Sequence, residues 1–305
     1  MANANQETIE FSGDAGFSEK FFAAAATPLK MRFGAATHTG HVRASNEDHF
    51  AIVRRTRTSE LILASLPPAE LALERDHDFA MIVADGMGGE RFGEFASRMA
   101  LRKMFELANR ATSWVMRITD AETQQVRQRV EAYVQQIQRA LREYTRKHPV
   151  TAGMGTTWTS VHLMPPHALL VHLGDSRAYL MHDGELRQLT RDETMAQAFI
   201  DAGMDPASVS RFRHVLINSF GGDNDDVTAQ TRQLLFGAGD QLLLCTDGLT
   251  DMVDEATIAQ QLKLSRSPQE ACDALVACAL ANGGKDNVTV ALASAEAASG
   301  SALAS

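Results

Sequence analysis

Two apolar runs in this sequence each end in an Asp-Gly pair. The run FAMIVA leads into Asp85, and the run QLLLCT leads into Asp247. Short apolar runs bounded by turn residues are typical of buried β-strands. The chain is therefore expected to fold so that buried strands bring carboxylates to the edge of a sheet, beside residues that have no side chain.

The order of the other elements indicates antiparallel sheets with helices outside them. Two long segments with helical periodicity, about 90–109 and 121–147, stand between groups of strand-like runs. A third helix is predicted at about 268–281, directly before the stop signal NGG. Because strands and helices do not alternate regularly, this order disfavours a parallel doubly wound sheet and favours an α+β fold.

Composition divides the chain into three parts. Residues 1–30 are predicted to form a mobile N-terminal arm, residues 31–294 one globular domain, and residues 295–305 a disordered tail. A long insertion at 54–78 separates two strands of the domain, and the sequence leaves open whether it is an extended hairpin or a docking element.

Charge and apolar content exclude several classes of function. The net charge is −9 and no long Lys/Arg block occurs, which argues against binding to nucleic acid or to an anionic membrane. We find no transmembrane span and no secretory signal. The three cysteines lack the spacing of a disulfide or zinc framework, so they indicate buried thiols in a reducing, cytoplasmic compartment.

Carboxylates gather at four predicted strand ends. Asp286 precedes the run NVTVALA, and Glu47 and Asp48 precede the run HFAIV, in addition to Asp85 and Asp247. Each one alone is most simply a turn or cap residue. Brought together, they would repel one another unless a hard divalent cation such as Mg²⁺ or Mn²⁺ lay between them. No His or Cys cluster accompanies them, which disfavours zinc.

One arginine stands near these acids. Arg43 lies four residues before Glu47, and its guanidinium is suited to hold a phosphate through two hydrogen bonds. The simpler interpretation is a surface arginine in a loop. Metal ions beside a phosphate-binding arginine would indicate phosphoryl chemistry with a metal-activated water.

Six motifs in order make the sequence similar to a known family, the bacterial metal-dependent Ser/Thr protein phosphatases of type 2C. The motifs are GHVRASNEDHF, VADGMGGERFGEFAS, GMGTTWTSV, VHLGDSRAYLMHDGELRQLTRDET, LLLCTDGLTD and GGKDNVTV. The resemblance implies a four-layer αββα sandwich, in which two antiparallel sheets are flanked by helix pairs. It also implies a mobile flap at about 192–218.

The resemblance further implies a centre of two Mn²⁺ or Mg²⁺ ions. In that family the residue matching Asp85 bridges the two metals. Asp247 and Asp286 would complete the protein ligands of the first metal, and the carbonyl of Gly86 would bind the second.

The remaining roles implied by the family concern water and substrate. Glu47 and Asp48 would hold waters of the second metal, and Arg43 would bind the substrate phosphate. The implied reaction is direct hydrolysis of phosphoserine or phosphothreonine in proteins by a water or hydroxide that bridges the two metals, without a covalent phosphoenzyme.

The sequence departs from the family where a third metal is concerned. Bacterial relatives usually carry an Asp just before GMGTT, whereas residues 148–157 contain no carboxylate. Asp251 alone is therefore expected to give a weak third site or none. Arg211, Arg213 and His214 of the flap could touch substrate, although a solvated face is the simpler interpretation. Asp175 is interpreted as a turn or supporting residue and not as a ligand.

These observations predict a monomeric phosphatase that acts on phosphorylated proteins and has a cognate Ser/Thr kinase. Two alternatives remain at this point. One is a pseudophosphatase that binds phosphoproteins or a partner without turnover, and the other is an enzyme for small phosphate esters.

Overall fold

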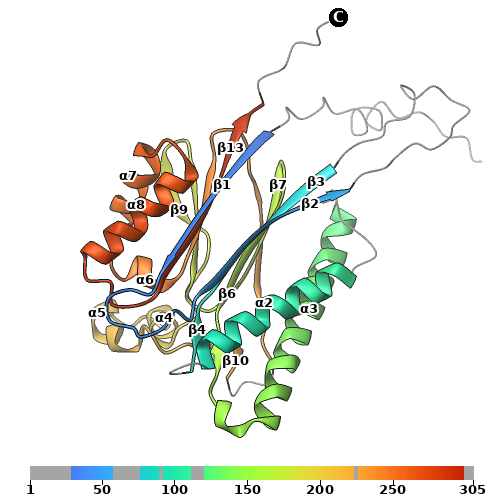
Figure 1. Cartoon of the computed structure of the whole chain (residues 1–305), viewed down its shortest axis with the longest axis vertical. Coiled ribbons are helices and arrows are strands. Elements are labelled where there is room, and N and C mark those ends of the chain that lie inside the picture. Colours follow the sequence, from blue (N-terminus) through green and yellow to red (C-terminus); the bar gives the residue numbers. More distant parts are fainter. Residues whose placement is uncertain (1–28, 58–75, 89–91, 111–119, 223–225, 299–305) are drawn as a thin grey trace, which may run out of the picture.

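The computed structural model describes residues 29–57, 76–88, 92–110, 120–222 and 226–298. In this part of the chain, two five-stranded antiparallel sheets pack face to face (Figure 1). The first sheet has the order β1 (Leu29–His38), β13 (Val288–Ala297), β12 (Gln241–Cys245), β8 (Arg177–His182), β9 (Glu185–Gln188). The second has the order β11 (Gln230–Leu235), β7 (His167–Leu173), β6 (Trp158–Met164), β3 (Asp76–Ala84), β2 (His49–Arg57).

A pair of helices covers the outer face of each sheet. Helices α7 (Glu255–Leu264) and α8 (Pro268–Ala281) lie on the first sheet, and α2 (Phe92–Arg110) and α3 (Asp120–Lys147) lie on the second (Figure 1). The result is a four-layer αββα sandwich, which confirms the predicted fold class.

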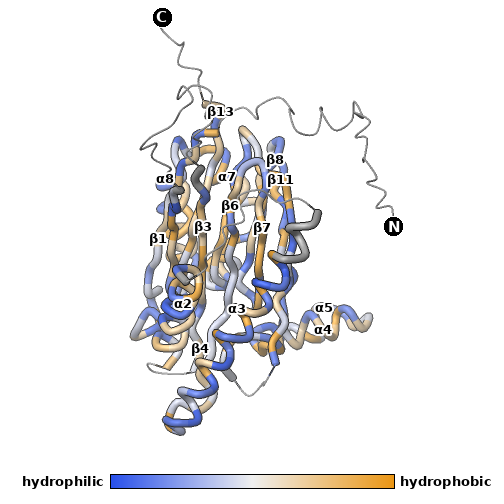
Figure 2. Tube along the Cα trace, turned by 90° about the vertical axis from the view of Figure 1, so that its right-hand side faces the viewer, coloured by the Kyte–Doolittle hydropathy of each residue, from blue (hydrophilic) through white to orange (hydrophobic). Residues whose placement is uncertain are grey.

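The apolar strands are buried on both faces, which explains why their sequences do not alternate between apolar and polar residues. In β3, Met81 and Val83 pack between the two sheets, whereas Ile82 and Ala84 pack against α2 and α3. Figure 2 shows apolar residues running along the strands in the middle of the molecule. These strands form a rigid support for the residues at their ends.

A small third sheet closes one end of the sandwich. It has the order β10 (Phe220–Gly221), β5 (Gly155–Thr156), β4 (Gly86–Met87). Strand β4 follows directly after Asp85, and the one-turn helix α6 (Asp247–Thr250) begins at the end of β12. Both Asp-Gly pairs of the sequence therefore lie at the same end of the molecule.

The segment predicted to form the flap projects from this end. It contains α4 (Met195–Asp201), α5 (Pro206–Val209) and the 3₁₀ turn η3 (Ser210–Phe212), and Figure 2 shows α4 and α5 standing away from the sheets. The side chains of Thr194 and Asp205 cap α4 and α5 by accepting backbone hydrogen bonds.

Most element positions follow the sequence closely, with small differences at the ends. Strand β1 already begins at Leu29, and β13 continues to Ala297, past the expected start of the tail. Residues 54–57 of the predicted insertion belong to β2, and residues 76–78 belong to β3. Residues 58–75, the arm before residue 29 and the tail after residue 298 lie outside the described part. Among the described helices, none is long and apolar enough to cross a membrane.

Candidate metal centre

The predicted site residues surround one cavity of about 410 Å³ at the end of the sandwich where β3 and β12 terminate. The residues of the predicted site that line this cavity are Arg43, Glu47, Asp85, Gly86, Asp247, Asp251 and Asp286. Asp48 is not part of the lining and is buried. Carboxylates that are up to 239 positions apart in sequence thus share one cavity.

The backbone of Asp85 is held in place by hydrogen bonds with Thr156 and Thr157. Its amide donates to Oγ1 of Thr157 over 3.0 Å, and its carbonyl accepts from the amide of Thr157 and from Oγ1 of Thr156, each over 2.9 Å. Because both backbone groups are paired, the position of Asp85 at the end of β3 is fixed before any ligand binds.

Asp48 directly precedes β2 of the second sheet, and it is held by a residue that directly follows β12 of the first sheet. Its Oδ2 accepts a hydrogen bond from Oγ1 of Thr246, the residue before Asp247, over 2.9 Å. Burial, together with repulsion from Asp247 and Asp286, raises the pKa of Asp48 to about 7. This contact joins the loop before β2 to the end of β12.

Asn287 fixes the loop that carries Arg43 and Glu47. Its Oδ1 accepts from the amide of Glu47 over 2.8 Å, and its Nδ2 donates to the carbonyls of Thr39 and Ser45. Sequence reasoning gave Asn287 no role. The only available signal was its position directly after Asp286.

The electrostatics of the cavity favour a bound cation. Burial raises the pKa of Asp85 well above its usual value, and the neighbouring carboxylates of Asp48 and Asp247 raise it further. Asp175 shows the same effect, through burial and then Asp247. Such clustering of acids is costly unless positive charge compensates it.

Two carboxylate oxygens of the cluster are free to act as ligands. Oδ1 of Asp247 and Oδ1 of Asp48 are buried and have no hydrogen-bond partner among the described residues. Buried polar atoms are normally satisfied, and oxygen-rich sites of this kind suit Mg²⁺ and Mn²⁺. The donor set therefore fits hard divalent cations.

Glycine is required where the start of α2 meets this centre. A Cβ atom on Gly86 would collide with the backbone of Gly93, and a Cβ on Gly93 would collide with the carboxylate of Glu47. Three backbone segments can approach one another here only because these two positions lack side chains.

Arg43 reaches the cavity from the loop between β1 and β2. Its Nη2 lies 2.6 Å from Oδ2 of Asp286, and slightly more than half of the Arg43 side chain is exposed. The guanidinium thus has donors left for a ligand that enters from solvent.

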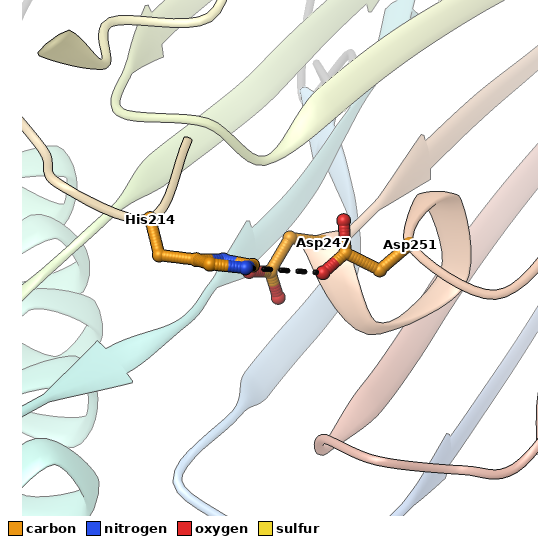
Figure 3. A group of neighbouring side chains, drawn as sticks. All are labelled: His214, Asp247 and Asp251. Atoms are coloured by element: carbon orange, nitrogen blue, oxygen red, sulfur yellow. Dashed lines mark ion pairs between the residues drawn. The ribbon is translucent and has the colours of Figure 1, made fainter. Parts of the chain in front are cut away.

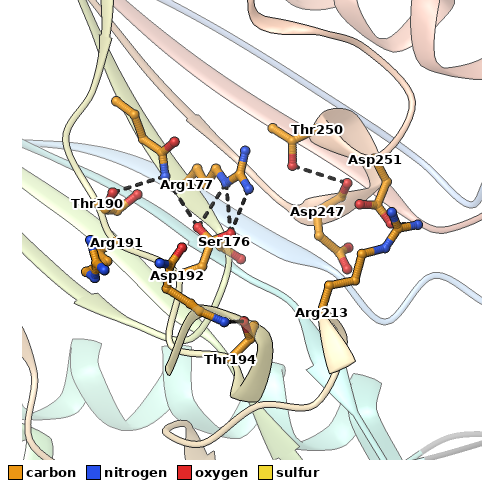
Figure 4. Close-up of polar contacts among 12 residues, drawn as sticks. Ser176, Arg177, Thr190, Arg191, Asp192, Thr194, Arg213, Asp247, Thr250 and Asp251 are labelled. Carbon is orange, nitrogen blue, oxygen red and sulfur yellow. Dashed lines mark hydrogen bonds and ion pairs between the residues drawn. The ribbon is translucent and has the colours of Figure 1, made fainter. Parts of the chain in front are cut away.

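The base of the flap is fastened to the core at both ends. Arg177 donates to both carboxylate oxygens of Asp192, through Nε over 2.9 Å and Nη2 over 2.6 Å (Figure 4). The neighbouring Glu193 accepts from the amide of Gly174 over 3.0 Å and from Nδ2 of Asn218 over 2.8 Å. Its carbonyl accepts from the amide of Ile217.

Two of the flap residues that the sequence indicated as possible substrate contacts, Arg213 and His214, lie at the cavity, although more than half of each side chain is exposed. Both residues line the cavity, because the chain after η3 turns back toward α6. Nη2 of Arg213 lies 3.7 Å from Oδ2 of Asp251, and Figure 4 shows the two side chains together. Figure 3 shows the imidazole of His214 beside the same carboxylate. Their neighbour Arg211 instead lies over the ring of Phe212. No local sequence signal distinguishes these three residues.

Comparison with known proteins identifies the family. The sequence profile of protein phosphatase 2C matches residues 70–282. The chain belongs to the protein phosphatase 2C family. The resemblance found in the sequence motifs is thereby confirmed.

Two bacterial relatives show how far the likeness extends. The Ser/Thr protein phosphatase PstP of Mycobacterium tuberculosis is 31% identical over 268 residues, which is 87% of this chain and 45% of the relative. The chain thus spans less than half the length of that protein. The Ser/Thr phosphatase Stp of Listeria monocytogenes is 32% identical over 221 residues, which is 72% of this chain and 85% of the relative.

Solved structures of the family have the same architecture. The catalytic domain of PstP in complex with two manganese ions is 30% identical, with a TM-score of 0.68, covering 88% of this chain and all of that one. The Ser/Thr phosphatase of S. agalactiae is 25% identical, with a TM-score of 0.71, covering 87% of this chain and 99% of that one.

Proposed function

We propose that the chain is a metal-dependent phosphatase that hydrolyses phosphoserine and phosphothreonine in proteins. The observation that carries this proposal is the single cavity in which Asp85, Asp247 and Asp286 meet Arg43. The structure of the catalytic domain of PstP in complex with two manganese ions supports a centre of two Mn²⁺ or Mg²⁺ ions.

Each residue has a distinct part in this proposal. Asp85, Asp247 and Asp286 hold the metal ions directly, together with the carbonyl of Gly86. When bound, the ions supply a water that is acidic enough to attack phosphorus at neutral pH. The rigid ends of β3 and β12 fix the ligand geometry before substrate binds.

The remaining residues of the proposed site, Glu47, Asp48 and Arg43, bind water or substrate instead of contacting the metal ions directly. Glu47 and Asp48 orient metal-bound water, and the held position of Asp48 against Thr246 suits that role. Arg43 binds the phosphate of the substrate from the solvent side of the cavity. Phosphorylated proteins are the substrates, a Ser/Thr kinase is the opposing enzyme, and the phosphatase works as a monomer.

The test is hydrolysis of p-nitrophenyl phosphate and of a phosphothreonine peptide by the metal-free chain, with and without added ions. Activity is expected to vanish in EDTA and to return with Mn²⁺ or Mg²⁺, but not at a comparable rate with Ca²⁺, which prefers longer bonds and more ligands. Full activity in EDTA after exhaustive dialysis would refute the two-metal proposal. Hydrolysis of the small ester but not of the peptide would favour the alternative of a small-ester phosphatase.

A further inference from the structure

A buried serine in the turn between β7 and β8 contacts the residue that holds Asp85. Oγ of Ser176 lies 2.8 Å from Oγ1 of Thr157, and both side chains are almost completely buried. Thr157 in turn accepts a hydrogen bond from the amide of Asp85 and donates its own amide to the carbonyl of Asp85. Three separate segments of the chain, which end or turn at residues 85, 157 and 176, are thus joined by a continuous line of hydrogen bonds.

The hydroxyl of Thr157 is shared between the other two residues. A hydroxyl group has one hydrogen to donate and two lone pairs to accept with. Because Oγ1 of Thr157 accepts from the amide of Asp85, its hydrogen remains available for Oγ of Ser176. Donation to Ser176 makes the oxygen of Thr157 a stronger acceptor, since linked hydrogen bonds polarise one another. Ser176 therefore both orients the side chain of Thr157 and strengthens its contact with Asp85.

The same turn also fixes Thr157 by packing. A Cβ atom on Gly174 would lie 2.7 Å from Cγ2 of Thr157, and Gly174 has a φ of +103°, so this position requires glycine. The backbone at residue 174 accordingly limits the movement of the methyl group of Thr157, while Ser176 binds its hydroxyl. Thr157 is held on both branches of its side chain.

The turn that carries Ser176 is itself anchored from its other side. The amide of Glu193 donates to the carbonyl of Gly174 over 2.7 Å, and the amide of Gly174 donates to Oε2 of Glu193 over 3.0 Å. The next residue after Ser176 is Arg177, which donates to both carboxylate oxygens of Asp192 (Figure 4). Ser176 thus occupies a fixed position that does not depend on Asp85.

We infer that Ser176 is a positioning residue for Asp85, and that it acts through the hydroxyl of Thr157. This inference deepens the proposed function and rests on it, because the exact position of Asp85 matters for turnover only if that residue bridges the metal ions. Ser176 does not line the cavity, so it has no direct contact with substrate or metal in this role.

The indirect role predicts which kinetic constant changes. A small displacement of a metal ligand alters the geometry in which the reaction occurs, whereas the phosphate is bound by a different residue, Arg43. Ser176→Ala in the full chain is expected to lower kcat roughly tenfold at saturating Mn²⁺, as is usual for residues that support metal ligands. KM for p-nitrophenyl phosphate should stay within about twofold of the wild type.

Ser160→Ala is the matched control for this variant. Its hydroxyl also makes a hydrogen bond inside the protein, from Nε1 of Trp158 over 2.9 Å, but Ser160 does not line the cavity and has no contact with Thr157 or Asp85. Ser160→Ala should therefore keep the kcat of the wild type. If Ser176→Ala does not fold, Ser176→Cys gives the same test, because a thiol has a similar shape and only weak hydrogen-bonding capacity.

A double-mutant cycle shows whether Ser176 acts through Thr157. Thr157→Val removes the hydroxyl at nearly constant shape and should lower kcat, whereas Thr157→Ser keeps the hydroxyl and should recover most of the loss. In the Thr157→Val background, adding Ser176→Ala should lower kcat by less than about twofold, since the contact is already absent.

Amide hydrogen exchange in EDTA gives a readout that needs neither metal nor substrate. The amide of Asp85 is protected by its bond to Thr157, so Ser176→Ala should speed its exchange roughly tenfold, as measured by NMR. The amide of Val83, two residues earlier within β3, is the internal reference and should change much less. A general loss of stability would instead speed both amides alike.

Two outcomes would overturn the inference. One is a Ser176→Ala chain with the kcat and the Asp85 exchange rate of the wild type, and the other is an equal effect of Ser176→Ala in the wild-type and Thr157→Val backgrounds. Either result, obtained beside an active wild type, leaves the proposed function standing. An inactive wild type in Mn²⁺ and in Mg²⁺ would contradict the proposed function itself, while the exchange measurement would still decide whether Ser176 holds Asp85.

Discussion

The guanidinium of Arg43 forms an ion pair with the carboxylate of Asp286 across 2.6 Å, although the two residues are 243 positions apart. The pair joins a loop before the second sheet to the turn before β13. More than half of the Arg43 side chain is exposed, whereas Asp286 is one-third exposed. Asp286 therefore positions Arg43 at the mouth of the cavity while leaving donors for a phosphate.

Replacing Arg43 should weaken substrate binding more than turnover. Arg43→Ala is expected to raise KM roughly tenfold or more with a smaller change in kcat, because phosphate binding is shared by the ground and transition states. Arg43→Lys should recover part of this loss, since it keeps the charge but not the paired donors. Steady-state kinetics with p-nitrophenyl phosphate and inhibition by inorganic phosphate measure both effects. Unchanged KM and phosphate inhibition in Arg43→Ala would remove Arg43 from the phosphate site.

Asp85→Asn should abolish turnover while stabilising the metal-free fold. The raised pKa of Asp85 means that its folded-state carboxylate is costly at neutral pH, so removing the charge should raise the Tm in EDTA at about pH 8 by about 2–5 °C. This gain should fade as the pH falls, because the wild-type carboxyl then takes up a proton. Excess Mn²⁺ should reverse the order by stabilising the wild type more.

The exposed Asp273 on α8 gives the control for this experiment. Asp273→Asn should leave the Tm nearly unchanged, with and without Mn²⁺. A Tm of Asp85→Asn below that of the wild type in EDTA would show that the carboxylates of the cavity do not strain the metal-free fold.

His172 should make the folded state sensitive to mild acid. Burial lowers its pKa to about 4, and Nε2 donates to the carbonyl of Arg191. The unfolded chain takes up this proton below about pH 6.5 and the folded chain does not until about pH 4, so stability falls over this window as the pH decreases. Between about pH 7.5 and about pH 5, the wild type should lose about 2 kcal/mol more than His172→Gln.

Urea unfolding in EDTA at the two pH values measures this difference. Comparing how the free energy of unfolding changes with pH in the two chains removes the contributions of other titrating groups, because these are common to both chains. His148→Gln, at an exposed histidine, should follow the wild type. Parallel pH dependences for the wild type and His172→Gln would contradict a neutral buried His172.

Gly248→Ala should damage both stability and metal affinity. A Cβ on Gly248 would collide with the carbonyl of Asn287, the residue that holds the loop of Glu47. The backbone would have to shift, at a cost of about 2–4 kcal/mol, and Mn²⁺ should bind more weakly. Gly237→Ala is the control, because its Cβ would lie 3.9 Å from the nearest atom, in Asp240. Equal Mn²⁺ affinity in the two variants would show that the close contact between Gly248 and Asn287 does not affect metal binding.

The sequence predicted best what depends on local pattern. Strands β3 and β12 and helix α8 lie close to their expected positions, because their apolar runs and stop signals are decided by nearby residues. Helix α7 was missed as a defined element, although the cap Asp254 and the buried pair Ile258 and Leu262 mark it.

Contacts between distant segments could not be predicted in the same way. The hydrogen bonds of Asn287 to Glu47 and Ser45 span about 240 positions, and nothing in the local sequence indicates them. The position of His214 beside Asp251 likewise depends on how the whole flap returns to α6. Such residues are found only when the fold brings their elements together.

The neck formed by Asp192, Glu193 and Asn218 makes the flap an exchangeable unit. Hydrogen bonds of these three residues fasten both ends of the flap to the core and to each other, and they involve none of the residues between 195 and 212. Residues 195–212, which do not line the cavity, could therefore change during evolution, and with them the surface offered to a phosphoprotein, while the carboxylates of the cavity stay in place. Among relatives that differ in this way, substrate recognition and phosphate hydrolysis can diverge at different rates. A chimera joined at this neck would show whether a foreign flap changes substrate preference, the rate of hydrolysis, or both.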